Sequence, residues 1–418
     1  MNAPVPSPMR RGACPGLSAP MATGDGLLAR LMPSGATIAL PAFRGLCDAA
    51  ARHGNGIIEI TSRGSIQVRG LTAASAGPFA ADVAALGIPA AEGIPVLPDP
   101  LSDLDDLSVI DAGVIAGELR RALAASALAS KLPAKVSVIV DGGGALHLDD
   151  VVADVRLRAV RTDQGVRVHV GLGGTAASAM SIGAVALHCA VECAVHLLDL
   201  LAAFSPQRMR NAVEDAGAAR FISAMAGILE PASTPAARPA ADPVGVHALR
   251  SGAVVGVALP FGHSGAENLS RLIGEVECAG AAGVRTAPGR ALLFVNLRPA
   301  AADAFAARAA TLGFIADPAD PRRKVIACAG APICASGQIP ARALAPAVAQ
   351  AVRAANVVGP VHVSGCAKGC AHQVPVPLAI FGRAGACDIH WNGKLVSSVN
   401  ADALAVQLER LLPEEVSR

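Results

Sequence analysis

The chain has little net charge, few lysines and no long uninterrupted run of hydrophobic residues. Its 35 basic and 33 acidic residues leave a formal net charge of +2, which argues against a broad nucleic-acid-binding surface. No extended polar or charged tract occurs, and 52% of its 418 residues are hydrophobic. We therefore expect a globular protein that binds no nucleic acid and is long enough for two or more domains.

The most hydrophobic window covers residues 180–204, and polar residues interrupt it. His188, Glu192, His196 and Asp199 recur at about one helical turn, so the window predicts a largely buried helix and not a membrane span. The first thirty residues contain two adjacent arginines but no apolar run of the length that a signal peptide has. These features predict a cytoplasmic protein without membrane association.

Only five of the 35 basic residues are lysines, and thirty are arginines. One explanation is coding bias, because the sequence is also rich in alanine. The other is a partner that carries carboxylate groups, which the forked guanidinium group binds in a bidentate manner. Composition alone leaves both explanations open.

An internal repeat covers most of the chain at a slowly drifting offset, so that Leu40 corresponds to Leu259 and Gly87 to Gly313. Each copy predicts the same order of elements. First comes a strand that ends at a proline and is followed by a helix, and then two strands joined by a turn that carries an arginine. A further strand follows later in each copy. The corresponding segments are 34–41 and 256–260, 57–71 and 284–297, and 132–138 and 359–365. Their preserved order indicates a gene duplication.

A proline-rich stretch, residues 231–245, predicts a linker between the two halves. Before it, residues 135–148 and 153–171 predict a β-meander with turns at 141–144 and 163–165. The glycine pattern at 171–176 formally matches dinucleotide-binding folds, but no second parallel strand with a ribose-binding acid follows it. We therefore expect no nucleotide-binding fold there.

Four cysteines in the second half have the spacing of a metal site. Cys328 and Cys334 are separated by five residues, and Cys366 and Cys370 by three. In a reducing compartment, four thiolates suit an iron–sulfur cluster or zinc. The first spacing is wide for zinc, and nearby glycines allow backbone N–H groups to approach cluster sulfurs. The pattern favours a cluster, with a zinc-stabilised binding protein and unliganded cysteines as alternatives.

A second group of polar residues, His188, Glu192 and His196, forms a ridge at four-residue steps. Such a ridge can bind a hard metal such as non-haem iron. The simpler interpretation is the polar stripe of a mostly buried helix. Cys47, Cys278 and Cys387 are interpreted as small core residues.

These features together resemble the sulfite and nitrite reductases, a duplicated family in which a 4Fe-4S cluster lies beside a tetrapyrrole. The segment "EITSRGSIQVRGL" (59–71) is similar to the stretch that lines the family's tetrapyrrole pocket. The resemblance implies that the cluster is bound by Cys328, Cys334, Cys366 and Cys370. It also implies that the tetrapyrrole is contacted by Arg30, Thr61, Arg63, Gln67 and Lys135.

Two departures separate the chain from the reductases. The family's second lysine near Lys135 is Ser137 here, and residues 92–106 contain no arginine where the reductases have one. An oxyanion site would thereby lose positive charge. Residues 11–31 and 362–372 instead resemble the precorrin-3B synthases, a branch of the same family in aerobic cobalamin biosynthesis.

In that branch the tetrapyrrole is the substrate. The resemblance implies an O2-dependent monooxygenase that hydroxylates precorrin-3A and closes a γ-lactone, with NADH as the electron source, directly or through a separate reductase. It also implies a 4Fe-4S cluster and a mononuclear non-haem iron. The iron ligands are not assigned, and the candidates are His362, His372 and the ridge of His188, Glu192 and His196. The alternative function is a siroheme-dependent sulfite or nitrite reductase.

The implied fold is α+β: an internally duplicated sulfite/nitrite reductase-like fold in which two ferredoxin-like half-repeats pair into one domain, beside two mixed α/β domains. The expected half-repeats are residues 15–75 and 246–310. The expected mixed domains are residues 76–230, on the tetrapyrrole side, and 311–418, which carry the cluster, with the linker at 231–245.

Overall fold

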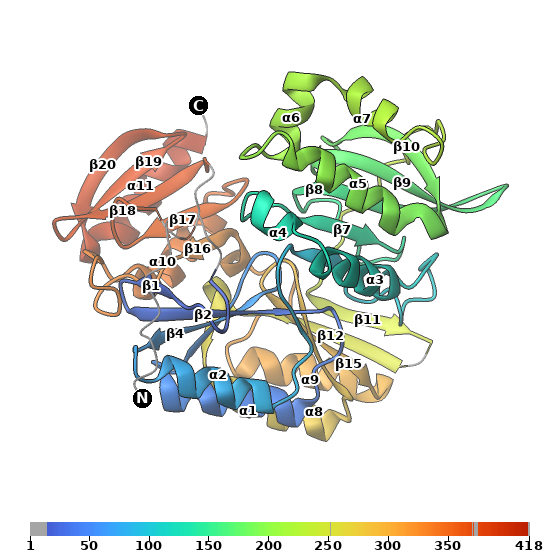
Figure 1. Ribbon diagram of the computed structural model, residues 1–418. Helices are drawn as coiled ribbons and strands as arrows, with labels where there is room; N and C mark the ends of the chain where they lie inside the picture. Colours follow the sequence, from blue (N-terminus) through green and yellow to red (C-terminus); the bar gives the residue numbers. More distant parts are fainter. Residues whose placement is uncertain (1–14, 251, 370, 372–374, 417–418) are drawn as a thin grey trace.

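The computed structural model describes residues 15–250, 252–369, 371 and 375–416. In this part of the chain the strands form four sheets, and helices pack against them (Figure 1). The fold is α+β, as the sequence predicts. No helix within these residues is long and apolar enough to cross a membrane.

Two antiparallel sheets lie in the lower half of Figure 1. The first has the strand order β1-β2-β4-β3-β13, with β5 beside β2, and the second has the order β11-β12-β15-β14. The strands of the first are β1 (Met21–Thr23), β2 (Gly26–Pro33), β3 (Ile57–Ile60), β4 (Ile66–Leu71), β5 (Ala90–Ala91) and β13 (His263–Gly265). Those of the second are β11 (Gly245–Leu249), β12 (Gly252–Ala258), β14 (Gly283–Ala287) and β15 (Ala291–Leu297).

Each antiparallel sheet also includes a piece of the other half of the chain. Strand β13 pairs with β3, which places His263 opposite Glu59. In return, Ile38 forms an isolated bridge with Val284 of β14. A helix follows each of these exchanged pieces, so the exchange holds the two halves together through backbone hydrogen bonds.

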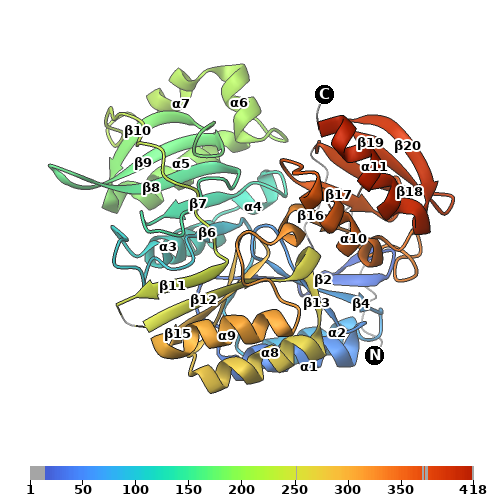
Figure 2. The ribbon, with the colours of Figure 1, turned by 180° about the vertical axis from the view of Figure 1, so that it is seen from behind.

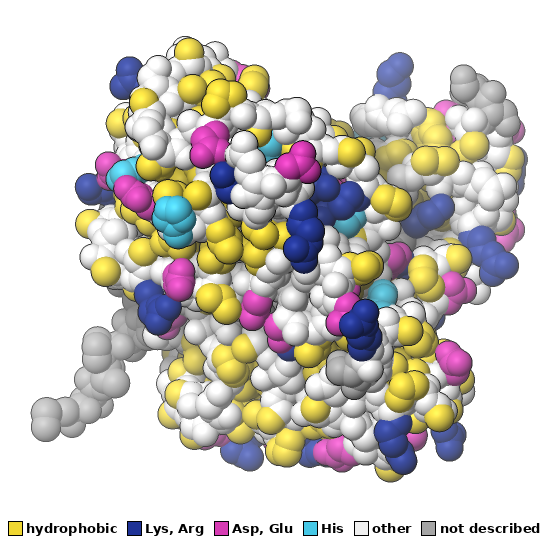
Figure 3. Space-filling view, turned by 90° about the vertical axis from the view of Figure 1, so that its right-hand side faces the viewer, with side chains coloured by type: hydrophobic (Ala, Val, Ile, Leu, Met, Phe, Trp, Pro, Cys, Tyr) yellow, Lys and Arg dark blue, Asp and Glu magenta, His cyan; other side chains and the backbone are white. Residues whose placement is uncertain are grey.

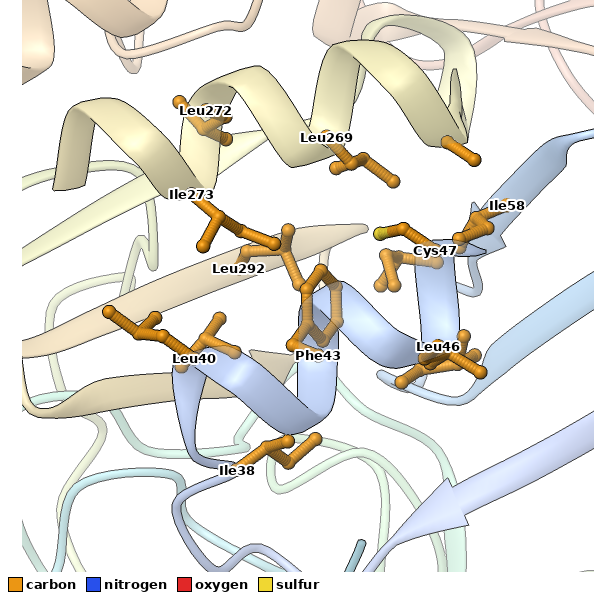
Figure 4. Packing of buried hydrophobic residues seen from close by; sticks show 14 of the residues in the cluster. Ile38, Leu40, Phe43, Leu46, Cys47, Ile58, Leu269, Leu272, Ile273 and Leu292 are labelled. Atoms are coloured by element: carbon orange, nitrogen blue, oxygen red, sulfur yellow. The ribbon is translucent and has the colours of Figure 1, made fainter. Parts of the chain in front are cut away.

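Four helices cover one face of these sheets: α1 (Leu40–His53), α2 (Ala76–Ala85), α8 (Ala266–Ala279) and α9 (Pro299–Thr311). Apolar residues recur at helical spacing on α1 and α8, so each helix turns one stripe toward the core. Phe43 of α1 lies near Ile273 of α8 and Leu292 of β15 (Figure 4), and Leu46 and Leu269 belong to the same buried cluster. All five are at most 1% exposed, and burial of each such side chain contributes about 1.5–3 kcal/mol.

The other two sheets share one topology, with orders β6-β7-β8-β9-β10 and β16-β17-β18-β19-β20. In both, the first three strands run parallel and the last two antiparallel. The first comprises β6 (Val96–Pro98), β7 (Val138–Asp141), β8 (Ala153–Thr162), β9 (Gly165–Gly174) and β10 (Met180–Ala186). The second comprises β16 (Val325–Ala327), β17 (Val361–Ser364), β18 (Leu378–Arg383), β19 (Ala386–Trp391) and β20 (Lys394–Asn400).

Helices pack against both mixed sheets. With the first are α3 (Ala112–Ala124), α4 (Leu128–Lys131), α5 (Ala190–Ala202), α6 (Met209–Ala216) and α7 (Ala218–Ala224), and with the second are α10 (Ala341–Ala354) and α11 (Leu404–Val416). Short 3-10 turns are η1 (Leu187–Cys189), η2 (Pro260–Gly262), η3 (Pro321–Lys324) and η4 (Ala401–Ala403). Figures 1 and 2 show the two mixed sheets standing apart on the side of the antiparallel sheets that α1, α2, α8 and α9 leave uncovered.

Three local predictions are wrong. Residues 34–37 are not a strand, because only Ile38 pairs, and α1 starts at Leu40. Residues 180–186 form β10 and not the start of a helix, because they pair with β9 across most of their length. Residues 141–144 do not form a hairpin turn, because β7 and the following strand β8 run parallel. All four residues of β7 are buried, as expected of a strand that is covered on both faces.

Other local predictions are confirmed. Strands β8 and β9 form the expected hairpin, with its turn at 163–164. The glycines at 171–174 belong to β9 and lead into the next antiparallel strand, so the dinucleotide pattern does not open a helix. On the face in Figure 3, acidic and basic side chains are interspersed, in agreement with the small net charge.

Candidate functional site

The parallel pair β16 and β17 brings two cysteine loops together. Cys328 directly follows β16, and Cys366 follows β17 two residues after its end. Because parallel strands end at the same edge of a sheet, both loops emerge side by side. The N–H of Cys328 donates to the carbonyl of Val363 at 3.1 Å, and the N–H of Gly365 donates to Cys328 Sγ at 3.0 Å.

Glycines let these two loops approach closely. A Cβ at Gly365 would lie 2.6 Å from the Cα of Gly330, and one at Gly337 would lie 2.4 Å from the N of Ala331. Gly330 also has a φ of +64°, which favours glycine. The N–H of Gln338 completes the junction by donating to the carbonyl of Gly365 at 2.7 Å.

Three of the four predicted thiols line one cavity of about 710 Å³. Cys328, Cys334 and Cys366 share its wall with residues of β1–β4, η2 and Arg290. Cys370 and the iron-ligand candidate His372 lie outside the described residues. The donor set fits an iron–sulfur cluster, because thiolates on glycine-rich loops receive a backbone N–H at sulfur.

A row of four polar side chains crosses the first antiparallel sheet, and three of them, Arg30, Glu59 and Gln67, also line the cavity. Backbone register places Arg30 of β2 opposite Gln67 of β4, Gln67 opposite Glu59 of β3, and Glu59 opposite His263 of β13. Side chains opposite one another point to the same face of the sheet. The row is therefore a consequence of strand register across both halves of the chain.

The side chains in this row hold one another. With its amide oriented by its partners, Gln67 accepts from Arg30 Nη2 at 2.6 Å and Nε at 3.0 Å and donates to Glu59 Oε2 at 3.1 Å. Glu59 also pairs with Arg69 Nη1 at 3.4 Å and with Arg342 of α10. These contacts restrict the Arg30 guanidinium to one orientation.

Burial and charge shift the pKa of His263, a member of the row, and of Asp25, which pairs with Arg69. Burial alone would raise the pKa of Asp25, but its two hydrogen bonds from Arg69, at 2.7 and 2.8 Å, and the charge of that residue hold this pKa below its usual value. Burial, followed by the positive charges of Arg342 and Arg290, lowers the pKa of His263 to about 3. His263 is therefore neutral at physiological pH.

The predicted tetrapyrrole-binding residues line this cavity and an adjoining one of about 280 Å³. Arg30 and Thr61 line both, Gln67 lines only the larger, and Arg63 and Lys135 line only the smaller. Arg63 Nη2 donates to the carbonyl of Val152 at 2.9 Å, and the Thr61 hydroxyl accepts the N–H of Ser65 at 2.9 Å. The structure thus brings all five together, with Arg63 and Thr61 also making contacts within the protein.

Sequence reasoning missed several charged residues of this site. Arg69 lies two positions beyond Gln67 on the same strand face, so strand alternation could have identified it. Glu59 and Arg342 are 283 positions apart, and no local pattern connects them. Lys368 was not missed: its place between Cys366 and Cys370 suggests either a cation beside a cluster or a substrate carboxylate, or a solvated loop lysine. In the structure it donates to Ser336 Oγ at 2.9 Å and lines the larger cavity together with Arg30, Arg69 and Arg290.

The remaining metal candidates lie elsewhere. His188, Glu192 and His196 are exposed along η1 and α5, beside the first mixed sheet, whereas His362 is buried in β17 with its ring against Phe381. Within the described residues, no three His, Cys, Asp or Glu side chains form a group that could hold a single metal ion. Cys47 and Cys387 are buried as predicted, but Cys278 is exposed, and its assignment to the core is wrong.

Comparison with known proteins finds similarity to a family model, to a curated protein and to a solved structure. Residues 19–86 match the family model of the nitrite/sulfite reductase ferredoxin-like half domain. A curated precorrin-3B synthase of Sinorhizobium sp is 39% identical over 387 residues, which cover 92% of this chain and 83% of that protein. The structure of the Mycobacterium tuberculosis NirA protein superposes with a TM-score of 0.73 at 19% identity, covering 92% of this chain and 80% of that one. The last match shows a shared fold.

Proposed function

The chain belongs to the precorrin-3B synthase family, and on that premise we propose that it converts precorrin-3A to precorrin-3B in aerobic cobalamin biosynthesis. In the proposed monooxygenase reaction, one atom of O2 enters the macrocycle at the meso carbon that is later lost in ring contraction. The other atom leaves as water, with two electrons supplied by NADH, directly or through a separate reductase. The ring A acetate closes as a γ-lactone.

One structural observation carries the proposal: a single cavity is lined by four cationic side chains and by three cysteines of adjacent loops. The cations are Arg30, Arg69, Arg290 and Lys368, and the one carboxylate among the described lining residues is Glu59. A tetrapyrrole with acetate and propionate groups needs such cations, and arginine binds carboxylates in a bidentate manner. The volume of about 710 Å³ is also typical of small-molecule sites.

We propose that Arg30, Thr61 and Gln67 bind substrate carboxylates in the larger cavity and that Arg63 and Lys135 bind one in the smaller cavity. Gln67 holds the Arg30 guanidinium through two hydrogen bonds, so little side-chain entropy is lost when a carboxylate binds. The two cavities share Arg30 and Thr61. This arrangement suits a flat ligand with acidic groups on several edges.

We propose that Cys328, Cys334, Cys366 and Cys370 hold a 4Fe-4S cluster. When bound, it supplies single electrons at the cysteine wall of the cavity. The N–H of Gly365 would stabilise the Cys328 thiolate, because a donor at sulfur offsets negative charge. The proposed mononuclear iron has no ligand set among the described residues, so we assign it none.

The same topology of the two mixed sheets supports the internal duplication. We propose two ferredoxin-like half-repeats, residues 15–75 and 246–310, and two mixed domains, 76–230 and 311–418. The loops after β7 and β17 correspond in this scheme, since each connects two parallel strands. The second mixed domain carries cysteines in that loop, and the first does not.

Two observations argue against an oxyanion reductase. Ser137, at the position of a reductase lysine, is fully buried, and its N–H donates to Asp154 Oδ2 at 2.9 Å. In the stretch 92–106, Asp103 pairs with Arg285 at 2.6 and 2.8 Å. Ser137 and Asp103 therefore make contacts within the protein, and neither position supplies a cation to the cavity.

The proposed function is tested with anaerobically purified, cluster-replete protein, precorrin-3A, a reductant and ¹⁸O2. We expect a hydroxylactone that carries one ¹⁸O atom by mass spectrometry. No product under these conditions would contradict the proposal. Sharp absorption bands of a bound metallo-tetrapyrrole together with sulfite or nitrite reduction would establish the reductase alternative instead.

A further inference from the structure

Arg290 differs from the other cations of the larger cavity in its contacts. It follows the Pro288–Gly289 turn between β14 and β15 and lines both this cavity and a neighbouring one of about 270 Å³. The corresponding turn of the first half carries Arg63. The duplicated hairpins thus each present one arginine, but to different cavities.

The other three lining cations have polar partners within the protein. Arg30 is held by Gln67, Arg69 by Asp25 and Glu59, and Lys368 by Ser336. The Arg290 backbone carbonyl accepts the N–H of Leu259 at 3.2 Å, but its guanidinium makes no hydrogen bond or ion pair with the residues that the structure describes. The acidic group whose charge acts on it, Glu59, is already bound by Arg69 and Arg342.

The protein holds Arg290 in this position at an energetic cost. Its backbone has a φ of +66°, a left-handed conformation that is strained for a residue other than glycine. Its guanidinium lies against Gly262, where an added Cβ would come within 2.7 Å of Nη1. Burial lowers the pKa of Arg290, with only partial compensation from Glu59.

We propose that Arg290 is a specificity-determining residue that binds a carboxylate of the tetrapyrrole substrate on the second-half side of the cavity. A half-buried guanidinium without an acceptor has a desolvation penalty that an incoming carboxylate removes. Because Gly262 has no Cβ, the Arg290 guanidinium has room beside it. This inference rests on the proposed function for the identity of the ligand, and on the contacts of Arg290 for the chemistry.

The test measures binding of uroporphyrin III, a stable tetrapyrrole with an acetate and a propionate on every ring, by fluorescence quenching. Arg290→Asn is the variant, because asparagine tolerates the left-handed backbone. We expect its dissociation constant to rise roughly 10- to 100-fold, the effect of losing a hydrogen bond between charged groups. Arg308→Asn, at an exposed position on α9, should bind as the wild type does.

Thermal unfolding without ligand distinguishes ligand binding from a structural role. Removing an unpartnered buried charge should leave the melting temperature of Arg290→Asn equal to or above that of the wild type. A lower melting temperature, or unchanged uroporphyrin affinity, would overturn the inference. If the wild type binds uroporphyrin through Arg290 but does not convert precorrin-3A, the proposed function fails and this inference stands. If it binds neither tetrapyrrole, both fail.

Discussion

Arg342, near the start of α10, forms an ion pair with Glu59 of β3 and so connects a helix of the second mixed sheet to the first antiparallel sheet. The side chains are only 10% and 19% exposed. Arg342 Nε and Nη1 are buried and have no partner among the described residues. Glu59 is therefore the single acidic contact on which the buried guanidinium depends within that part of the chain.

Glu59→Gln should destabilise the protein, because it leaves Arg342 without its counter-charge. We expect the free energy of unfolding in urea to fall by about 3 kcal/mol. The matched control is Glu277→Gln, whose ion pair with Arg44 is 37% and 43% exposed and should contribute at most about 1 kcal/mol. Equal effects of the two substitutions would contradict the importance of the Glu59–Arg342 pair.

Gly365→Ala should separate the two cysteine loops, because its Cβ would lie 2.6 Å from Gly330 Cα and 3.4 Å from Cys328 Sγ. We expect lower iron and sulfide content after reconstitution and a lower melting temperature. Gly274→Ala is the control: nothing lies within 4 Å of its added Cβ in α8, and the change should stabilise the helix by up to about 1 kcal/mol. Full iron content in Gly365→Ala would show that the cluster binds without this close approach of the two loops.

Cys366→Ala should abolish cluster binding, since Cys366 lines the cavity together with Cys328 and Cys334. Cys370→Ala should have the same effect if the predicted fourth ligand is correct. Both are measured by iron, acid-labile sulfide and visible absorbance. The control is Cys278→Ala, which removes an exposed thiol outside the proposed ligand set and should retain the cluster. Equal loss of the cluster in all three variants would refute the four-cysteine assignment.

Folding stability should depend on pH through His263. Its pKa is about 3 in the folded protein and near 6.5 when unfolded, so between these values only the unfolded state binds the proton. The free energy of unfolding should therefore decrease as the pH falls from about 6.5 toward 3, by at most about 1.4 kcal/mol per unit.

His263→Gln should flatten this dependence, measured as urea unfolding at pH 7.5 and pH 5. His188→Gln, at an exposed position, should keep the wild-type slope. A His263→Gln variant with the wild-type slope would show that other groups cause the acid sensitivity.

Arg30→Gln should weaken binding of a tetrapyrrole polycarboxylate, since Gln67 holds the Arg30 guanidinium at the shared wall of both cavities. We expect the dissociation constant of uroporphyrin III to rise by roughly tenfold or more. Unchanged affinity would exclude Arg30 from the proposed set of substrate-binding residues.

Local patterns predicted those parts of the site whose residues are close in sequence. The spacing of Cys328, Cys334 and Cys366 identified thiols that line one cavity, and the stretch 59–71 identified the strands that face them. The errors arose where pairing decides the conformation. Residues 180–186 are as apolar as a buried helix, but an available edge of β9 makes them a strand. Residues 141–144 have the composition of a tight turn, but the buried β7 pairs in parallel with β8, and two parallel strands need a longer crossover connection.

The sequence by itself determined the duplication pattern, the thiol spacing and the family resemblance, because each depends on residue identity and order along the chain. Only the tertiary structure decided that Glu59 contacts Arg342, and that Arg30, Gln67, Glu59 and His263 form one row. It also decided that the Arg290 guanidinium has no polar partner among the described residues. These relationships depend on strand register and on packing between segments hundreds of residues apart. Hydrogen bonding across the exchanged strands sets that register, and no local periodicity in the sequence encodes it.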